Sequence, residues 1–90
     1  MSKYDRLTEF LTHQLSDEVV LSFEDIEDGD RIGVKLPDSA KTYRQWWENQ
    51  VSPGARQCRA WLDAGWEVKN VDLNAERVVL QRRDVTSAAR

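Results

Sequence analysis

The sequence predicts one α+β domain in which a helix, a strand, three further helices and a β-hairpin follow one another and build a three-stranded antiparallel sheet. All four tryptophans fall within residues 39–66. Side chains of that size bury more area than any others, so the core must form around this segment. Apolar residues recur with helical spacing before it and with strand spacing after it. A chain of 90 residues has room for one core, which we expect over residues 1–83, with a frayed tail at 84–90.

The first 30 residues predict a helix, a strand and a second, short helix. Residues 4–15 are expected to form an amphipathic helix, because their apolar side chains recur every three or four positions. The segment from Glu18 to Phe23 alternates and carries β-branched valines, which is typical of a strand. Ser22 can cap a helix that begins at Phe23, with Asp25 as the acidic residue of a capping box.

The tryptophan segment predicts two consecutive helices. The first is expected over residues 38–49 and the second over 52–65, where Gly65 ends it. Aligned at an offset of 15 residues, the two helices present the same faces. A buried stripe is expected at Ala40, Tyr43 and Trp47 and at Ala55, Cys58 and Leu62, with Trp46 and Trp61 on one flank.

Residues 66–83 predict a β-hairpin with its turn at Asn74–Glu76. The apolar alternation changes parity between Val68 and Val71, so a bulge near Lys69–Asn70 is needed for both to face the core. The complete order of elements is that of a winged helix-turn-helix with one extra helix inserted before the wing.

Charge is distributed unevenly along the chain, although the net charge is only -3. The first 30 residues carry two basic and nine acidic side chains, whereas the remaining residues carry eleven basic and seven acidic ones. The second part could therefore attract phosphate. The alternative is that both sets of charges only solvate the surface.

The order of elements and the charge together favour a non-enzymatic nucleic-acid-binding module, with DNA as the expected partner. In a winged helix the helix after the turn enters the major groove, and the hairpin contacts phosphates, which position the protein without specifying sequence. The residues expected to contact nucleic acid are Lys41, Arg44, Gln45, Arg56 and Arg59 on a basic helical ridge, and Lys69, Arg77, Arg82 and Arg83 on the hairpin.

A protein-interaction module, either an adaptor or an inhibitor, is the alternative function. Its acidic N-terminal part could bind a basic partner, or Trp46 and Trp61 could anchor one, as interface tryptophans often do. Self-association through the same patch is a further possibility. The competing interpretation is that both tryptophans are core residues, and their exposure distinguishes the two.

The remaining residue types argue against catalysis and against a bound cofactor or metal. The chain has one histidine, His13, and one cysteine, Cys58, and it lacks a CxxC motif and a glycine-rich phosphate loop. The acidic run at 24–30 does not fit a calcium loop, because Ile26 and Lys35 would fall at ligand positions. With no apolar run of membrane-spanning length and no apolar signal segment, we expect no membrane association and a cytoplasmic location.

Three stretches of the sequence resemble a known family: VVLSFEDIE, GVKLPDSAKTYRQWWEN and AWLDAGWEVKNVDLNAERVVLQR. The resemblance is to an uncharacterised family of small bacterial domains, found alone or attached to other domains that include GIY-YIG-type nucleases. It covers residues 4–83 and departs from the family pattern at EDGDRIG and NQVSPGARQ. It implies a nucleic-acid-related role without an established activity.

Overall fold

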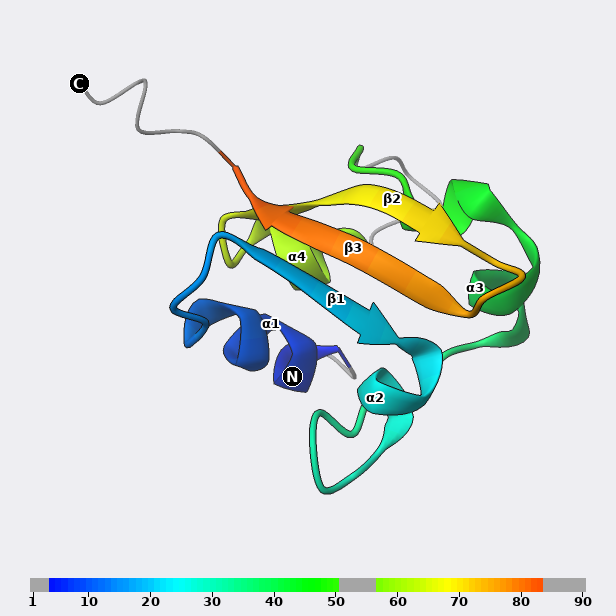
Figure 1. Ribbon diagram of the computed structural model, residues 1–90, viewed down its shortest axis with the longest axis horizontal. Helices are drawn as coiled ribbons and strands as arrows, with labels where there is room; N and C mark the ends of the chain where they lie inside the picture. The colour runs from blue at the N-terminus through cyan, green and yellow to red at the C-terminus, as the bar shows by residue number, and fades with distance from the viewer. Residues whose placement is uncertain (1–3, 51–56, 84–90) are drawn as a thin grey trace.

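The computed structural model describes residues 4–50 and 57–83, which fold into a three-stranded antiparallel sheet with helices against one of its faces (Figure 1). The predicted α+β class and the three-stranded sheet are confirmed. The predicted tail at 84–90 lies outside the described residues. The elements in chain order are α1 (Asp5–Thr12), β1 (Glu18–Ser22), α2 (Phe23–Glu27), α3 (Asp38–Thr42), the 3-10 helix η1 (Arg44–Trp47), α4 (Arg59–Leu62), β2 (Trp66–Asp72) and β3 (Arg77–Arg82).

The sheet has β3 in its centre, with β1 and β2 as antiparallel neighbours on either side. The register between β2 and β3 shifts between Val68 and Asn70, which confirms the predicted bulge. Without this extra residue, Trp66 and Val71 would point to opposite faces of the sheet. With it, both side chains are buried in the core.

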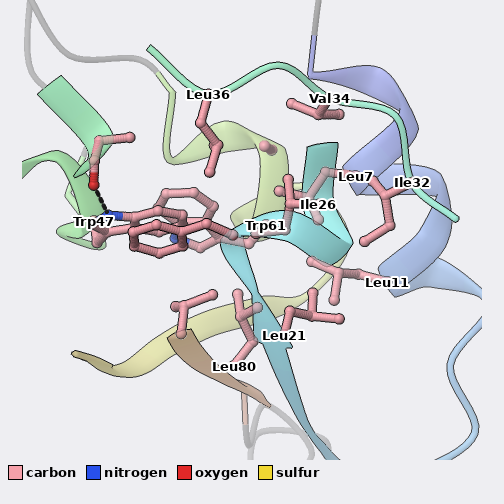
Figure 2. Packing of buried hydrophobic residues seen from close by; sticks show 14 of the residues in the cluster. Leu7, Leu11, Leu21, Ile26, Ile32, Val34, Leu36, Trp47, Trp61 and Leu80 are labelled. Carbon is pink, nitrogen blue, oxygen red and sulfur yellow. Dashed lines mark hydrogen bonds between the residues drawn. The ribbon is translucent and has the colours of Figure 1, made fainter. Parts of the chain in front are cut away.

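The core lies between the sheet and the helices, and three stacked aromatic rings occupy its centre (Figure 2). The ring of Trp47 lies between those of Phe23 and Trp61, with centroid distances of 5.5 Å and 5.7 Å. The expectation that the core forms around the tryptophan segment is therefore confirmed. Aliphatic side chains from α1, α2, the strands and the following loop surround the stack, among them Leu7, Leu11, Leu21, Ile26, Ile32, Val34, Leu36 and Leu80.

Helix α1 is shorter than the sequence predicts. It ends at Thr12, and Leu7 and Leu11 carry its buried face. Leu15, which the apolar spacing placed on the same stripe, is 98% exposed. The chain leaves the helix before Leu15 because it must turn back to begin β1 at Glu18.

The start of α2 is fixed by the capping box that the sequence predicts. The hydroxyl of Ser22 accepts a hydrogen bond from the backbone N–H of Asp25 at 2.9 Å, and the carboxylate of Asp25 accepts one from the backbone N–H of Ser22 at 3.1 Å. The other carboxylate oxygen of Asp25 pairs with Arg31 at 3.2 Å. The hydrogen bond from the Ser22 backbone is the main cause that holds the pKa of Asp25 below its usual value of 3.8.

We expect the Asp25 carboxylate to make the fold sensitive to acid. Because its pKa is lower in the folded state than in the unfolded state, its stabilisation is present above pH 3.8 and is lost as the pH falls through the folded pKa. Asp25→Asn should therefore flatten the loss of unfolding free energy between about pH 5 and about pH 2, measured by urea denaturation. Asp30→Asn, the same change at an exposed carboxylate of the next loop, should leave the slope unchanged.

The prediction of two continuous tryptophan helices is wrong. The first is broken at Tyr43, whose backbone is extended (φ -119°, ψ 127°) and whose side chain is 58% exposed instead of buried. In a continuous helix the carbonyl of Ala40 would accept the backbone N–H of Arg44. It accepts the indole N–H of Trp47 instead, at 2.8 Å, and this bond turns the tryptophan under α3 into the core (Figure 2).

The second predicted helix is confirmed only near its end. Helix α4 spans four residues, from Arg59 to Leu62, and its predicted start at residues 52 and 53 lies outside the described residues. Gly65 ends the segment as predicted, with a left-handed backbone (φ +82°) that a residue with a side chain adopts only at a cost. The chain then enters β2 directly.

Candidate functional site

The predicted nucleic-acid contacts lie on several separate elements, because the helix that would have aligned them is broken at Tyr43. They therefore do not share one helical ridge. Arg56 lies outside the described residues. The structure places Lys41 on α3, Arg44 and Gln45 on η1, Arg59 on α4, Lys69 on β2, Arg77 and Arg82 on β3, and Arg83 directly after β3.

Most of the basic side chains among them pair with carboxylates of the same chain. Four of the five ion pairs in the described residues join an acid from residues 17–27 to a base from residues 31–82. The uneven charge along the sequence is thus largely neutralised inside the fold, which weakens any attraction for phosphate. The pairs that involve predicted contacts are Lys41 with Glu27, Lys69 with Glu18, Arg82 with Asp17 and Arg83 with Glu67.

Two of the predicted contact arginines also hold parts of the backbone together. The guanidinium of Arg82 donates to the carbonyls of Gln14 and Ser16, at 2.8 and 3.1 Å, and stacks on Trp66 at 4.9 Å. It thereby ties the connection between α1 and β1 to β3. Arg44 donates to the carbonyl of Val71 on β2 at 2.8 Å. Both side chains have structural roles, and their role in nucleic-acid binding stays a prediction.

Arg59 and Arg77 differ from the other predicted contacts. Both are exposed, and neither forms an ion pair within the described parts of the chain. They lie on different elements, Arg59 on the short α4 and Arg77 at the start of β3. Gln45 is likewise exposed, on η1.

The tryptophans belong mainly to the core. Trp61 was expected on a flank, but its side chain is 0% exposed and stacks on Trp47, so the expectation is corrected. Trp61 therefore offers no surface to a partner. Trp46 is half-buried, in edge-to-face contact with Tyr4 at 5.9 Å and with Trp47 at 4.7 Å.

Asn49 is a structural residue that the sequence analysis did not single out. Its side-chain oxygen accepts hydrogen bonds from the indole of Trp61 at 2.9 Å and from the backbone N–H of Val68 at 2.8 Å. Its amide nitrogen donates to the carbonyl of Val68 at 2.9 Å. The side chain thus pairs with β2 as a neighbouring strand would, and it covers part of that open edge. The polar residue directly after the Trp46-Trp47-Glu48 run was the available signal.

The outer face of the sheet is the largest surface that no helix covers, and it is the face turned toward the viewer in Figure 1. At its centre Val20 of β1 lies opposite Val79 of β3. Val20 is 51% exposed and Val79 is half-buried. A hollow of about 330 Å³ lies here, lined by Val20, Asn70, Asp72, Ala75, Arg77 and Val79.

The comparisons with known proteins identify a family. A family model described as Domain of unknown function (DUF7662) matches residues 4–83. The chain belongs to this family. The predicted resemblance to an uncharacterised domain family over these residues is therefore confirmed, whereas the bacterial origin and the association with nucleases stay predictions. The comparisons with curated proteins and with solved structures found no match.

This DUF7662 domain has two further surface grooves. One, of about 360 Å³, lies between α1 and the loop after α2, where Arg6, Glu9, His13 and Arg31 mix both charges. The other, of about 400 Å³, lies beside α2 and is acidic except for Lys41, whose ammonium group already pairs with Glu27. Neither combines an exposed apolar floor with an unpaired charge as the outer sheet face does.

The remaining chemical groups of this DUF7662 domain provide no reactive centre that we can identify. Cys58 is buried in the core, and burial raises the pKa of its thiol, which keeps it protonated at neutral pH. His13 donates from Nδ1 to the carbonyl of Glu9 at 2.8 Å on the exposed side of α1, since a carbonyl can only accept. Among the described residues, no three histidine, cysteine or acidic side chains are grouped to bind a metal ion, and no helix is long and apolar enough to cross a membrane.

Proposed function

We propose that the chain is a non-enzymatic protein-interaction module that binds its partner through the outer face of its sheet. The observation that carries this proposal is the exposed pair Val20 and Val79 over a hollow on a face without helices. Buried apolar contacts surrounded by polar groups are the usual anatomy of a protein interface. The module needs no cofactor, and we keep the cytoplasm as its proposed location.

The polar surroundings of the valine pair explain how this face stays in contact with water. An antiparallel sheet is stable with one face solvated, provided that this face is mainly polar. Glu18 pairs with Lys69 across the face at 3.2 Å, and Gln81 donates to Glu67 at 2.6 Å. The apolar surface is therefore confined to a small centre, which favours reversible binding over a permanent dimer.

Val20 provides the direct test of the proposal. Peptides selected from a random dodecapeptide display library against the wild-type domain should bind at least about tenfold more weakly to Val20→Glu and to Val20→Lys, because either charge would be buried against the apolar part of the peptide. Using both signs of charge separates loss of apolar contact from simple repulsion. Binding is measured by isothermal titration of the synthetic peptides.

Leu15→Glu is the matched control, since it places the same charge at an exposed aliphatic residue outside the sheet. It should leave peptide affinity unchanged, and circular dichroism should show all three variants folded. Selected peptides that bind both Val20 variants as tightly as the wild type would refute the proposed interface.

A nucleic-acid-binding module of the winged-helix type is the second candidate. It is favoured by the order of the elements, by the β1-β3-β2 strand order and by the exposed, unpaired Arg59 and Arg77 within the described residues. The many internal ion pairs make it the weaker candidate. Titration with mixed duplex DNA at increasing salt separates the two, because phosphate binding falls steeply with salt whereas the apolar interface does not.

A further inference from the structure

We infer that the partner of the outer sheet face is an extended peptide segment with an apolar side chain and a carboxylate two residues apart. This inference rests on the proposed function and specifies the chemistry of the same site. It follows from an arginine that the hairpin turn leaves without an ion pair, and from the distance of that arginine from the valine pair.

The unpaired arginine is Arg77. Its cross-strand neighbours are Ser22 on β1 and Asp72 on β2, so Asp72 is the expected ion-pair partner. The carboxylate of Asp72 instead accepts the backbone N–H of Ala75 at 3.0 Å, and this bond holds it toward the turn. Glu76, the next acid along the chain, lines the groove beside α2 instead of the hollow.

The other cations on or beside this face already have partners. Lys69 pairs with Glu18, and Arg83 pairs with Glu67. Arg77 is therefore the one basic side chain lining the hollow, and it forms no ion pair with a described residue. A planar guanidinium in this position is complementary to a carboxylate, which it can bind through two parallel hydrogen bonds.

The apolar part of the hollow fixes the spacing of the ligand. Val79 follows Arg77 by two residues on the same face of β3, so the two positions lie about 7 Å apart along the strand. An extended peptide repeats its side-chain direction with the same period. A segment that places an aliphatic or aromatic side chain over Val20 and Val79 therefore brings the side chain two positions away over Arg77.

A charge exchange at Arg77 tests this inference. Peptides selected against the wild type should be enriched in Asp or Glu two positions from an apolar residue, and Arg77→Glu should weaken their binding about tenfold. Selection against Arg77→Glu should instead enrich Lys or Arg at that position. The direct probes are two synthetic decapeptides that carry Leu-Ser-Glu or Leu-Ser-Lys in an otherwise identical sequence.

Arg59→Glu is the control, because it reverses an exposed charge on α4 instead of on the sheet, and it should not change the preference for Leu-Ser-Glu. Peptides that require Val20 but show no acidic enrichment and bind Arg77→Glu equally well would overturn this inference and leave the proposed interface in place. Peptides that do not require Val20 would overturn both.

Discussion

Trp47→Ala should lower the free energy of unfolding by about 3 to 5 kcal/mol, the largest effect that we expect of a single substitution in this chain. Trp47 is the middle ring of the core stack, with Phe23 on one side and Trp61 on the other. Its indole also satisfies the carbonyl of Ala40, which the break after α3 leaves without its helical partner. A domain of this size is stable by only about 5 to 13 kcal/mol, so the variant should lose a large part of its stability.

Two variants make this result specific to the stack. Trp47→Phe keeps an aromatic ring but loses the hydrogen bond to Ala40, so its loss should be about half as large. Trp46→Ala removes an indole of equal size from a half-buried position and should cost less than Trp47→Ala. Urea denaturation followed by circular dichroism measures all three. Equal losses for Trp46→Ala and Trp47→Ala would contradict the assignment of Trp47 to the centre of the core.

Asn49→Ala should lower the free energy of unfolding by about 2 to 4 kcal/mol, a large effect for an exposed polar residue. The substitution leaves the indole N–H of the fully buried Trp61 without an acceptor and removes both bonds to the backbone of Val68. Freed edge groups on β2 can also pair with another chain, so we expect more aggregation on heating.

The two bonds that Asn49 accepts can be separated from the one that it donates. Asn49→Asp keeps the acceptor for Trp61 and for the N–H of Val68, but it turns a second oxygen toward the carbonyl of Val68, so an intermediate loss is expected. Gln50→Ala, a change of the adjacent exposed amide, is the control and should be nearly neutral. Hydrogen exchange of the Val68 amide, followed by NMR, should accelerate in Asn49→Ala alone among these variants, and an unchanged rate would refute the edge role of Asn49.

The parts of the fold that sequence predicted correctly depend on neighbouring residues. The capping box of Ser22 and Asp25 needs only a spacing of three residues, and the bulge between Val68 and Asn70 follows from a change in apolar parity. Gly65 ends α4 through its own backbone freedom. These signals lie within short stretches, so no tertiary contact was needed to interpret them.

The predictions that failed are those that a distant contact overrides. Helical spacing placed Tyr43 in the core, but the bond from Trp47 to Ala40 breaks the helix at Tyr43 and leaves that ring in solvent. Trp61 appeared to lie on a flank because its partners, Trp47 and Asn49, come from another segment. Neither contact leaves a signal in local periodicity.

The charge pattern shows the same limit for the candidate site. Its separation along the chain was read as a basic surface, although in the fold the acids of residues 17–27 meet the bases that follow them. Alternation predicts that Val20 points away from Val19 and Leu21, yet only the sheet register brings it beside Val79 and Arg77. The unpaired state of Arg77 depends on a turn bond at Asp72, which the sequence does not reveal.

These findings assign separate roles to the two sides of the sheet. The tryptophan segment supplies the core and covers part of the edge of β2, so the residues that make the sequence distinctive are explained by folding. The opposite face carries no helix and holds the exposed valine pair. Function, on this account, belongs to the bare face of the sheet instead of to the tryptophans.

Addition of a soluble gadolinium chelate to labelled protein tests this division most directly, because it broadens the NMR signals of solvent-exposed groups. We predict strong broadening of the Val20 methyl groups, weaker broadening of Val79, and no broadening of the indole N–H signals of Trp47 and Trp61. Protected Val20 methyl groups together with a broadened Trp61 indole signal would contradict the account.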